Sequence, residues 1–94
     1  MDAAAFEAEL RRDGYEVVHR DLQPGVAVPE HSHPWDVRLL VLEGEITVEC
    51  DGERKTCGAS ETFSLEAGRR HSELHGPRGV RLIAGRRHLE KAPA

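Results

Sequence analysis

The chain has 94 residues, of which 38% are hydrophobic and 32% charged, and its formal net charge is −4. This size predicts one globular domain, near the lower end of the range in which a single core sustains itself. An acidic chain without a basic, aromatic-rich face argues against nucleic-acid binding. No apolar run approaches the roughly 20 residues of a membrane span. The acidic N-terminus lacks the features of a signal peptide, so we expect a cytoplasmic protein.

The chain begins with a predicted helix over residues 3–12. Asp2 can cap it, Phe6 and Leu10 share one face, and the following Asp-Gly pair ends it. We therefore divide the chain into an N-terminal helix over residues 1–14, a β-domain over residues 15–88 and a polar C-terminal tail over residues 89–94.

After Gly14 the sequence predicts only short strands. They are expected at residues 15–20, 26–28, 37–42, 45–50, 62–65, 70–74 and 80–84. Turn signals separate them at residues 23–25, 43–44, 51–52, 66–68 and 76–79. Short strands with such frequent turns are typical of an all-β sandwich or barrel.

Residues 39–42 form an apolar stretch, Leu-Leu-Val-Leu, inside one predicted strand. Alternate residues of a strand face opposite ways, so this strand is apolar on both faces. The outer face needs a cover, either the N-terminal helix or a second subunit. On this ground we expect a homodimer.

Cys50 and Cys57 flank the Asp51-Gly52 hairpin signal. If these two residues form the turn, Cys50 pairs with Glu53 and the two thiols do not face each other. We therefore expect free cysteines in a reducing compartment.

Three histidines form the main candidate site. His31 and His33 have the two-residue spacing that points side chains to one face of a strand, and His71 follows a turn later in the chain. Imidazole is a ligand for iron, zinc, copper and nickel, and three protein ligands leave positions open for water or substrate. The sequence predicts a metal site at His31, His33 and His71. We expect His19 and His88 to be ordinary surface or core residues.

The spacing of these residues resembles that of a small single-domain cupin. Gly25, His31-Ser32-His33 and Gly44 match the first cupin motif, and Gly68 with His71 matches part of the second. The likeness covers roughly residues 17–87. It implies a cupin-type double-stranded β-helix, or jelly-roll barrel, and a mononuclear divalent metal ion.

The sequence departs from the cupin motifs at four positions. Val37 stands at the position of the usual glutamate ligand, and the side chain of the neighbouring Asp36 should point the other way. Ser60 and Glu66 replace a glycine and a proline of the second motif, and His75 replaces its asparagine. Without the carboxylate, three neutral imidazoles leave the ion its full positive charge, which favours an anionic ligand.

Several residues near the histidines have open roles. Glu73 and His75 share the face of His71 by strand alternation. Glu73 is a candidate hydrogen-bond acceptor behind the metal or a general base, and His75 a candidate fourth ligand or proton shuttle. Trp35 either walls a ligand pocket or fills the core. The pair Arg86-Arg87 is interpreted as a solvated strand end.

The resemblance leaves three functions open. An all-histidine triad is similar to the iron sites of thiol and diketone dioxygenases, and also to zinc or nickel sites with a Lewis-acid role, as in a lyase or isomerase. The competing hypothesis is a non-enzymatic module that senses or stores a small molecule or metal. The third possibility is a structural cupin whose site has decayed.

Overall fold

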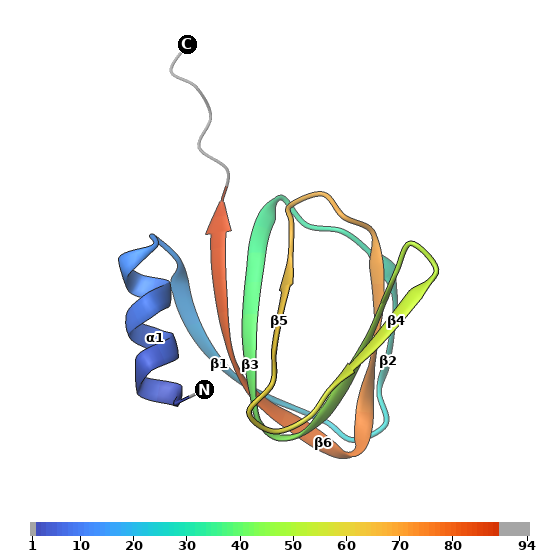
Figure 1. Cartoon of the computed structure of the whole chain (residues 1–94). Coiled ribbons are helices and arrows are strands. Elements are labelled where there is room, and N and C mark those ends of the chain that lie inside the picture. The colour runs from blue at the N-terminus through green and yellow to red at the C-terminus, as the bar shows by residue number, and fades with distance from the viewer. Residues whose placement is uncertain (1, 89–94) are drawn as a thin grey trace.

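The computed structural model describes residues 2–88 and consists of one helix and six strands (Figure 1). The helix is α1 (Ala3–Arg12). The strands are β1 (Glu16–Leu22), β2 (Ala27–His31), β3 (Trp35–Cys50), β4 (Glu53–Cys57), β5 (Thr62–Leu65) and β6 (His71–His88). The fold is all-β, with antiparallel strands and a single N-terminal helix, as the sequence predicts. The polar tail proposed for residues 89–94 lies outside the described residues.

Two long strands organise the barrel. β3 and β6 pair antiparallel along almost their whole length. The N-terminal half of β3 also pairs with β5, and its C-terminal half with β4. The N-terminal half of β6 pairs with β2, and its C-terminal half with β1. Because β3 and β6 pass through both groups of strands, they join two four-stranded layers that enclose a common interior (Figure 1).

The two predicted turns at residues 43–44 and 76–79 do not end strands. β3 and β6 instead continue through them and bend, with register shifts around Gly44. Gly44 pairs with Val80 and Ile46 with His75, so residues 76–79 form an excursion opposite a single residue of β3. Gly44 has a φ of 77°, and an added Cβ would lie 2.1 Å from the carbonyl oxygen of Gly79. Glycine is needed there because the bent strands approach so closely.

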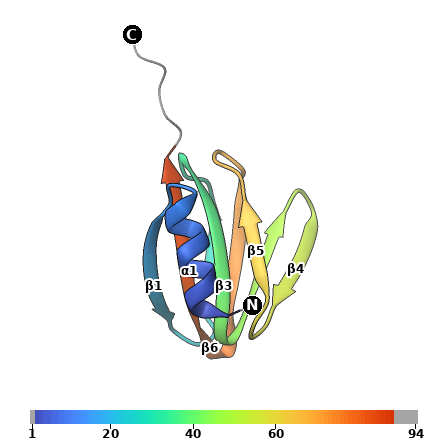
Figure 2. The ribbon, with the colours of Figure 1, turned by 60° about the vertical axis from the view of Figure 1, so that its left-hand side comes forward.

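The helix covers the outer face of the apolar stretch in β3. Asp2 accepts a hydrogen bond from the amide of Ala4 at 2.7 Å and caps the helix. Phe6 and Leu10 are fully buried against Leu40 and Ile83. Figure 2 shows α1 lying across the outside of the sheet formed by β1, β6 and β3. The outer face of β3 is therefore covered by the N-terminal helix, one of the two covers that the sequence allows.

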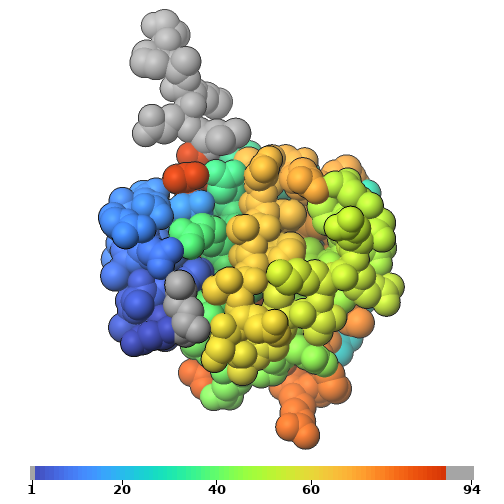
Figure 3. Space-filling view, in the orientation of Figure 1, coloured from blue at the N-terminus to red at the C-terminus, as the bar shows by residue number. Residues whose placement is uncertain are grey.

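The second apolar cluster fills part of the barrel interior. Leu39 and Val41, the alternate residues of the same stretch, pack there with Ile46, Val48 and Leu82. In the space-filling view of Figure 3, β4, β5 and the segments beside them close the front of the barrel. No helix within residues 2–88 is long and apolar enough to cross a membrane.

The cysteines follow the predicted register. Cys50 pairs with Glu53, while Cys57 pairs with Ile46 further along the hairpin. Both cysteines are free, and Cys57 is buried. Burial raises the pKa of the Cys57 thiol, which keeps it protonated at neutral pH.

Candidate metal centre

Three histidines from two chain segments meet at one end of the barrel. His31 ends β2 and pairs with His71, the first residue of β6. His33 lies in the connection to β3, and its carbonyl accepts a hydrogen bond from the amide of Gly68 at 2.9 Å. The strand thus ends before His33, so β-alternation alone does not bring the two imidazoles of the His-x-His pair together. The hydrogen bond to the Gly68 turn helps to fix the connection.

The histidine rings face a common point. Their centroids are 4.3 Å apart for His31 and His71, 5.0 Å for His33 and His71, and 5.7 Å for His31 and His33. One nitrogen from each ring can be chosen so that all three lie within 4.8 Å of one another. The three nitrogens could together hold one metal ion.

Backbone carbonyls orient two of the rings. Nδ1 of His31 lies 2.8 Å from the carbonyl oxygen of Pro29, and Nδ1 of His71 lies 2.9 Å from that of Arg69. In each ring Nδ1–H donates to the carbonyl two residues earlier, so the Nε2 lone pair faces inward. A metal-binding histidine is commonly held by such a bond from its other nitrogen.

The third ring has a buried nitrogen without a protein partner. Nδ1 of His33 makes no hydrogen bond with any described residue. Burial lowers the pKa of His33, which favours its neutral form, the form that binds metals. A neutral imidazole offers a lone pair to a cation, and His33 is one of the three histidines whose nitrogens converge, so the donor set fits a divalent metal ion.

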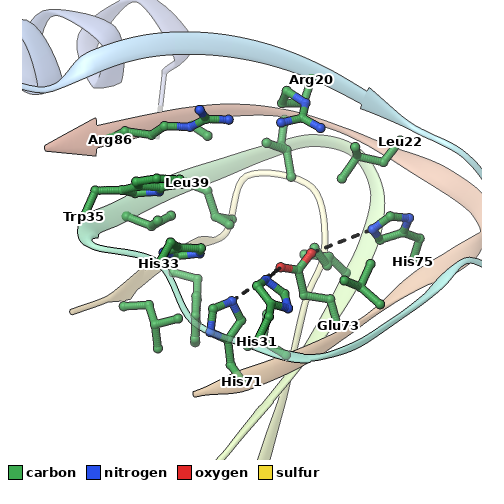
Figure 4. A pocket seen from close by; sticks show the side chains of 18 residues that line it. Arg20, Leu22, His31, His33, Trp35, Leu39, His71, Glu73, His75 and Arg86 are labelled. Atoms are coloured by element: carbon green, nitrogen blue, oxygen red, sulfur yellow. Dashed lines mark ion pairs between the residues drawn. The ribbon is translucent and has the colours of Figure 1, made fainter. Parts of the chain in front are cut away.

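Glu73 lies beside the histidines on the inner face of β6, as strand alternation predicts. Its Oε2 is 3.5 Å from Nε2 of His71 and 3.6 Å from Nε2 of His31. Its Oε1 is 3.8 Å from Nε2 of His75, a buried nitrogen without a hydrogen-bond partner among the described residues. Figure 4 shows the Glu73 carboxylate between the His31–His71 pair and His75.

Asp36 and Val37 lie as the sequence predicts. Asp36 accepts hydrogen bonds from the amide of Ala67 at 2.9 Å and from Arg87 at 3.2 Å. The bond from Ala67 lowers the pKa of Asp36 and keeps it ionised there, away from the histidines. Val37 lines the cavity onto which the histidines open. No carboxylate therefore stands at the usual glutamate position.

The cavity inside the barrel has a volume of about 290 Å³. Its walls combine the histidines and Glu73 with apolar side chains of β3, β5 and β6. Trp35 lines it as well and stacks on His33, with centroids 4.7 Å apart and planes 2° apart. Of its two possible roles, Trp35 therefore takes that of a pocket wall.

Two arginines of the cavity were missed by the sequence interpretation. Arg86 was expected at a solvated strand end and Arg20 was not singled out, yet both line the cavity. Only Arg87 points outward, where it pairs with Asp36. The available signal was strand alternation, because Arg86 continues the inward-facing series of Leu82 and Ala84. His19 lies outside and pairs with Glu7 of the helix.

The sequence from residue 18 to residue 81 matches the cupin domain family. The chain belongs to the cupin family. Among curated proteins, this cupin is similar to the tetracenomycin polyketide synthase protein TcmJ of Streptomyces glaucescens, with 37% identity over 54 residues. The aligned region is 56% of this chain and 36% of that protein, so the chain spans little more than a third of that relative.

Solved structures share the fold. An RmlC-like cupin from Shewanella frigidimarina aligns with a TM-score of 0.69 and 25% identity, over 82% of this chain and 68% of the other. KdgF from Halomonas sp. aligns with a TM-score of 0.70 and 18% identity, over 82% of this chain and 71% of the other. At these identities the similarity establishes the jelly-roll architecture, and the ligand must be argued from the cavity itself.

Proposed function

We propose that this cupin binds one divalent metal ion through His31, His33 and His71 and presents it to a small molecule in the cavity. The observation that carries the proposal is the convergence of three imidazole nitrogens, with two Nε2 atoms held inward by bonds at Nδ1. Iron, zinc and nickel all suit such a ligand set.

A bound ion would supply Lewis acidity or, as iron, the capacity for oxygen-dependent oxidation. Glu73, whose Oε2 lies 3.5 Å from Nε2 of His71, would then serve as the proton acceptor at the edge of the site. His75 would act behind it, because its Nε2 lies 3.8 Å from the other carboxylate oxygen. Nδ1 of His75 is held by the carbonyl of Gln23 at 3.2 Å.

The leading activity within this proposal is a dioxygenase-like oxidation, with a Lewis-acid lyase or isomerase reaction as the enzymatic alternative. Similarity to a polyketide synthase protein supports a small organic molecule as the ligand. A non-enzymatic cupin that senses or stores a small molecule or metal remains the second candidate, because the same three histidines serve it equally. A cytoplasmic location and a homodimer complete the proposal.

Metal content tests the site directly. Protein purified without an affinity tag should contain about one metal ion per chain, and His31→Ala, His33→Ala and His71→Ala should each remove most of it. His19→Ala is the matched control, since His19 lies outside the barrel against Glu7. Full metal retention in all three variants would refute the assignment.

Glu73→Gln separates the role of Glu73 from that of the ligands. We expect the variant to retain the metal but to show a lowered pKa of the metal-bound water, because no carboxylate charge then disfavours the bound hydroxide; the visible spectrum of cobalt-substituted protein measures it. A loss of metal as large as that of the histidine variants would instead make Glu73 a ligand. Oxygen consumption with a panel of thiols and diketones then distinguishes an oxidising enzyme from a sensor.

A further inference from the structure

Two arginines share one wall of the cavity. Arg20 of β1 lies opposite Leu82 of β6, and Arg86 lies four residues further along β6 on the same inward face. Ala84 stands between Leu82 and Arg86, and its small side chain leaves room above it. Figure 4 shows the two guanidinium groups near each other, across the cavity from the His31–Glu73–His71 group.

These two arginines lack the partners that most other arginines have. Within residues 2–88, seven arginines form ion pairs with carboxylates: Arg12, Arg38, Arg54, Arg69, Arg70, Arg81 and Arg87. Neither Arg20 nor Arg86 forms one with a described residue, although Glu16 is the cross-strand neighbour of Arg86. Both arginines therefore line the cavity with no carboxylate of residues 2–88 paired to either of them.

The stacking around Trp35 orients one of the two guanidinium groups. Arg86 Cζ lies 5.2 Å from the centroid of the Trp35 ring, and Trp35 in turn stacks on His33. A guanidinium over an aromatic ring is attracted to the ring face and can still donate N–H groups to a carboxylate. Arg86 is thus separated from a candidate metal ligand by one aromatic ring.

The charge of the cavity contrasts with that of the whole chain. The chain carries a formal charge of −4, whereas the cavity is lined by two arginines and one glutamate, a local excess of positive charge even before a metal is added. The remaining walls are largely apolar, with Leu39, Phe63 and Leu82 among them. An anionic group on an apolar body matches both features.

We propose that the ligand of this cupin is a small organic carboxylate whose carboxylate binds Arg20 and Arg86. Its apolar body would lie along the β3 and β6 side chains, and its other end would face the three histidines. The placement of this other end beside the histidines rests on the proposed metal site. The cavity volume of about 290 Å³ restricts the ligand to a small molecule.

Benzoate and the uncharged benzamide provide a matched pair of probes. Isothermal titration calorimetry should show benzoate binding at least about tenfold more tightly than benzamide, because charge-assisted hydrogen bonds are made only by the carboxylate. The fluorescence of Trp35, the single tryptophan of the chain, should change on saturation if the probe enters the cavity. Equal affinities for the two probes, or no change at Trp35, would overturn the proposal.

Arginine variants locate the binding. Arg20→Gln and Arg86→Gln should each weaken benzoate binding about tenfold or more and leave benzamide unaffected. Arg81→Gln is the control, because Arg81 lies on the same strand but pairs with Glu43 outside the cavity. Thermal unfolding of each variant checks that it is folded, and an equal loss of benzoate affinity in Arg81→Gln would contradict a specific site.

The titrations are run on zinc-loaded and on metal-free protein, so that the two proposals can fail separately. Arginine-dependent benzoate binding to a protein that takes up no zinc would refute the metal site and retain the carboxylate site. Binding of one zinc ion per chain with equal affinity for benzoate and benzamide would retain the metal site and refute the carboxylate site.

Discussion

Val37 occupies the place at which other cupins have a glutamate ligand, and its side chain lines the cavity. Val37→Glu should add a carboxylate to a preformed site and raise metal affinity by about 1 kcal/mol or more. Competition with a chromophoric chelator measures the change. Benzoate binding should weaken at the same time, because residue 37 pairs with Arg86 across the strands and the new charge competes for that arginine.

Val37→Gln is the control, since it has nearly the size of glutamate but no charge. We expect no gain in metal affinity from it. If Val37→Glu left the metal affinity unchanged and lowered the free energy of unfolding, residue 37 would be acting as a core residue. Its packing against the interior cluster makes that outcome a real alternative.

His33 gives the metal-free protein a defined pH dependence. Burial holds its pKa below the ordinary value of 6.5, so the folded chain binds the proton less readily than the unfolded chain. Stability from this histidine is present above the unfolded pKa and is lost as the pH falls from 6.5 toward the folded pKa. The pKa values of Asp13 and Asp36 are lowered from 3.8. Protonation of these two carboxylates therefore reduces stability only at pH values below about 3.8.

Urea unfolding of metal-free protein at about pH 7.5 and about pH 5.5 measures this loss. His33→Gln, which cannot titrate, should show a smaller difference between the two conditions. The same difference in both proteins would assign the pH dependence to other groups.

At the scale of elements, the helix is expected to contribute strongly to stability. Leu10 is completely buried and lies against Leu40 and Ile83. Leu10→Ala should lower the free energy of unfolding by about 2–5 kcal/mol, through lost burial and the cavity left behind. Arg11→Ala provides the comparison, because Arg11 is exposed on the same helix and its substitution should cost about 0.5 kcal/mol or less. Similar losses in the two variants would contradict the role given to α1.

Elements with local signals could be predicted from the sequence. The helix has the expected bounds and its Asp2 cap, and β5 has the expected residues, because caps and turn residues act within a few positions. The bends at Gly44 and at residues 76–79 could not be told from turns. A glycine permits the same backbone in both cases, and only the partner strand decides whether the chain reverses or continues.

The candidate site was predictable in part for the same reason. Spacing and the cupin resemblance brought His31, His33 and His71 together, and alternation placed Glu73 and His75 with them. Arg20 could not be predicted as a cavity residue, because no motif or local pattern in the neighbouring sequence indicates its position. Its position depends on the register of β1 against β6, a contact between residues about sixty positions apart.

For the whole molecule, the assembly state is the open prediction. The apolar strand face predicts a homodimer, and α1 covers that face in the single chain. Exposed Leu74 and Val26, together with the edge of β2 that pairs with no other strand of residues 2–88, offer another surface for a second copy. Light scattering should give twice the chain mass, and Leu74→Glu should reduce it to that of the monomer. A wild-type protein with the mass of one chain would contradict the dimer.

The excursion of β6 at residues 76–79 divides that strand into two parts that contribute different residues to the cavity. The part before it carries His71, Glu73 and His75, and the part after it carries Arg86. The excursion already places extra residues opposite a single residue of β3. A change in its length therefore need not move the side chains of either part to the opposite face of the strand. The proposed metal site and the proposed carboxylate site can therefore diverge independently during evolution, so that a descendant of this chain could retain the first while the second changes.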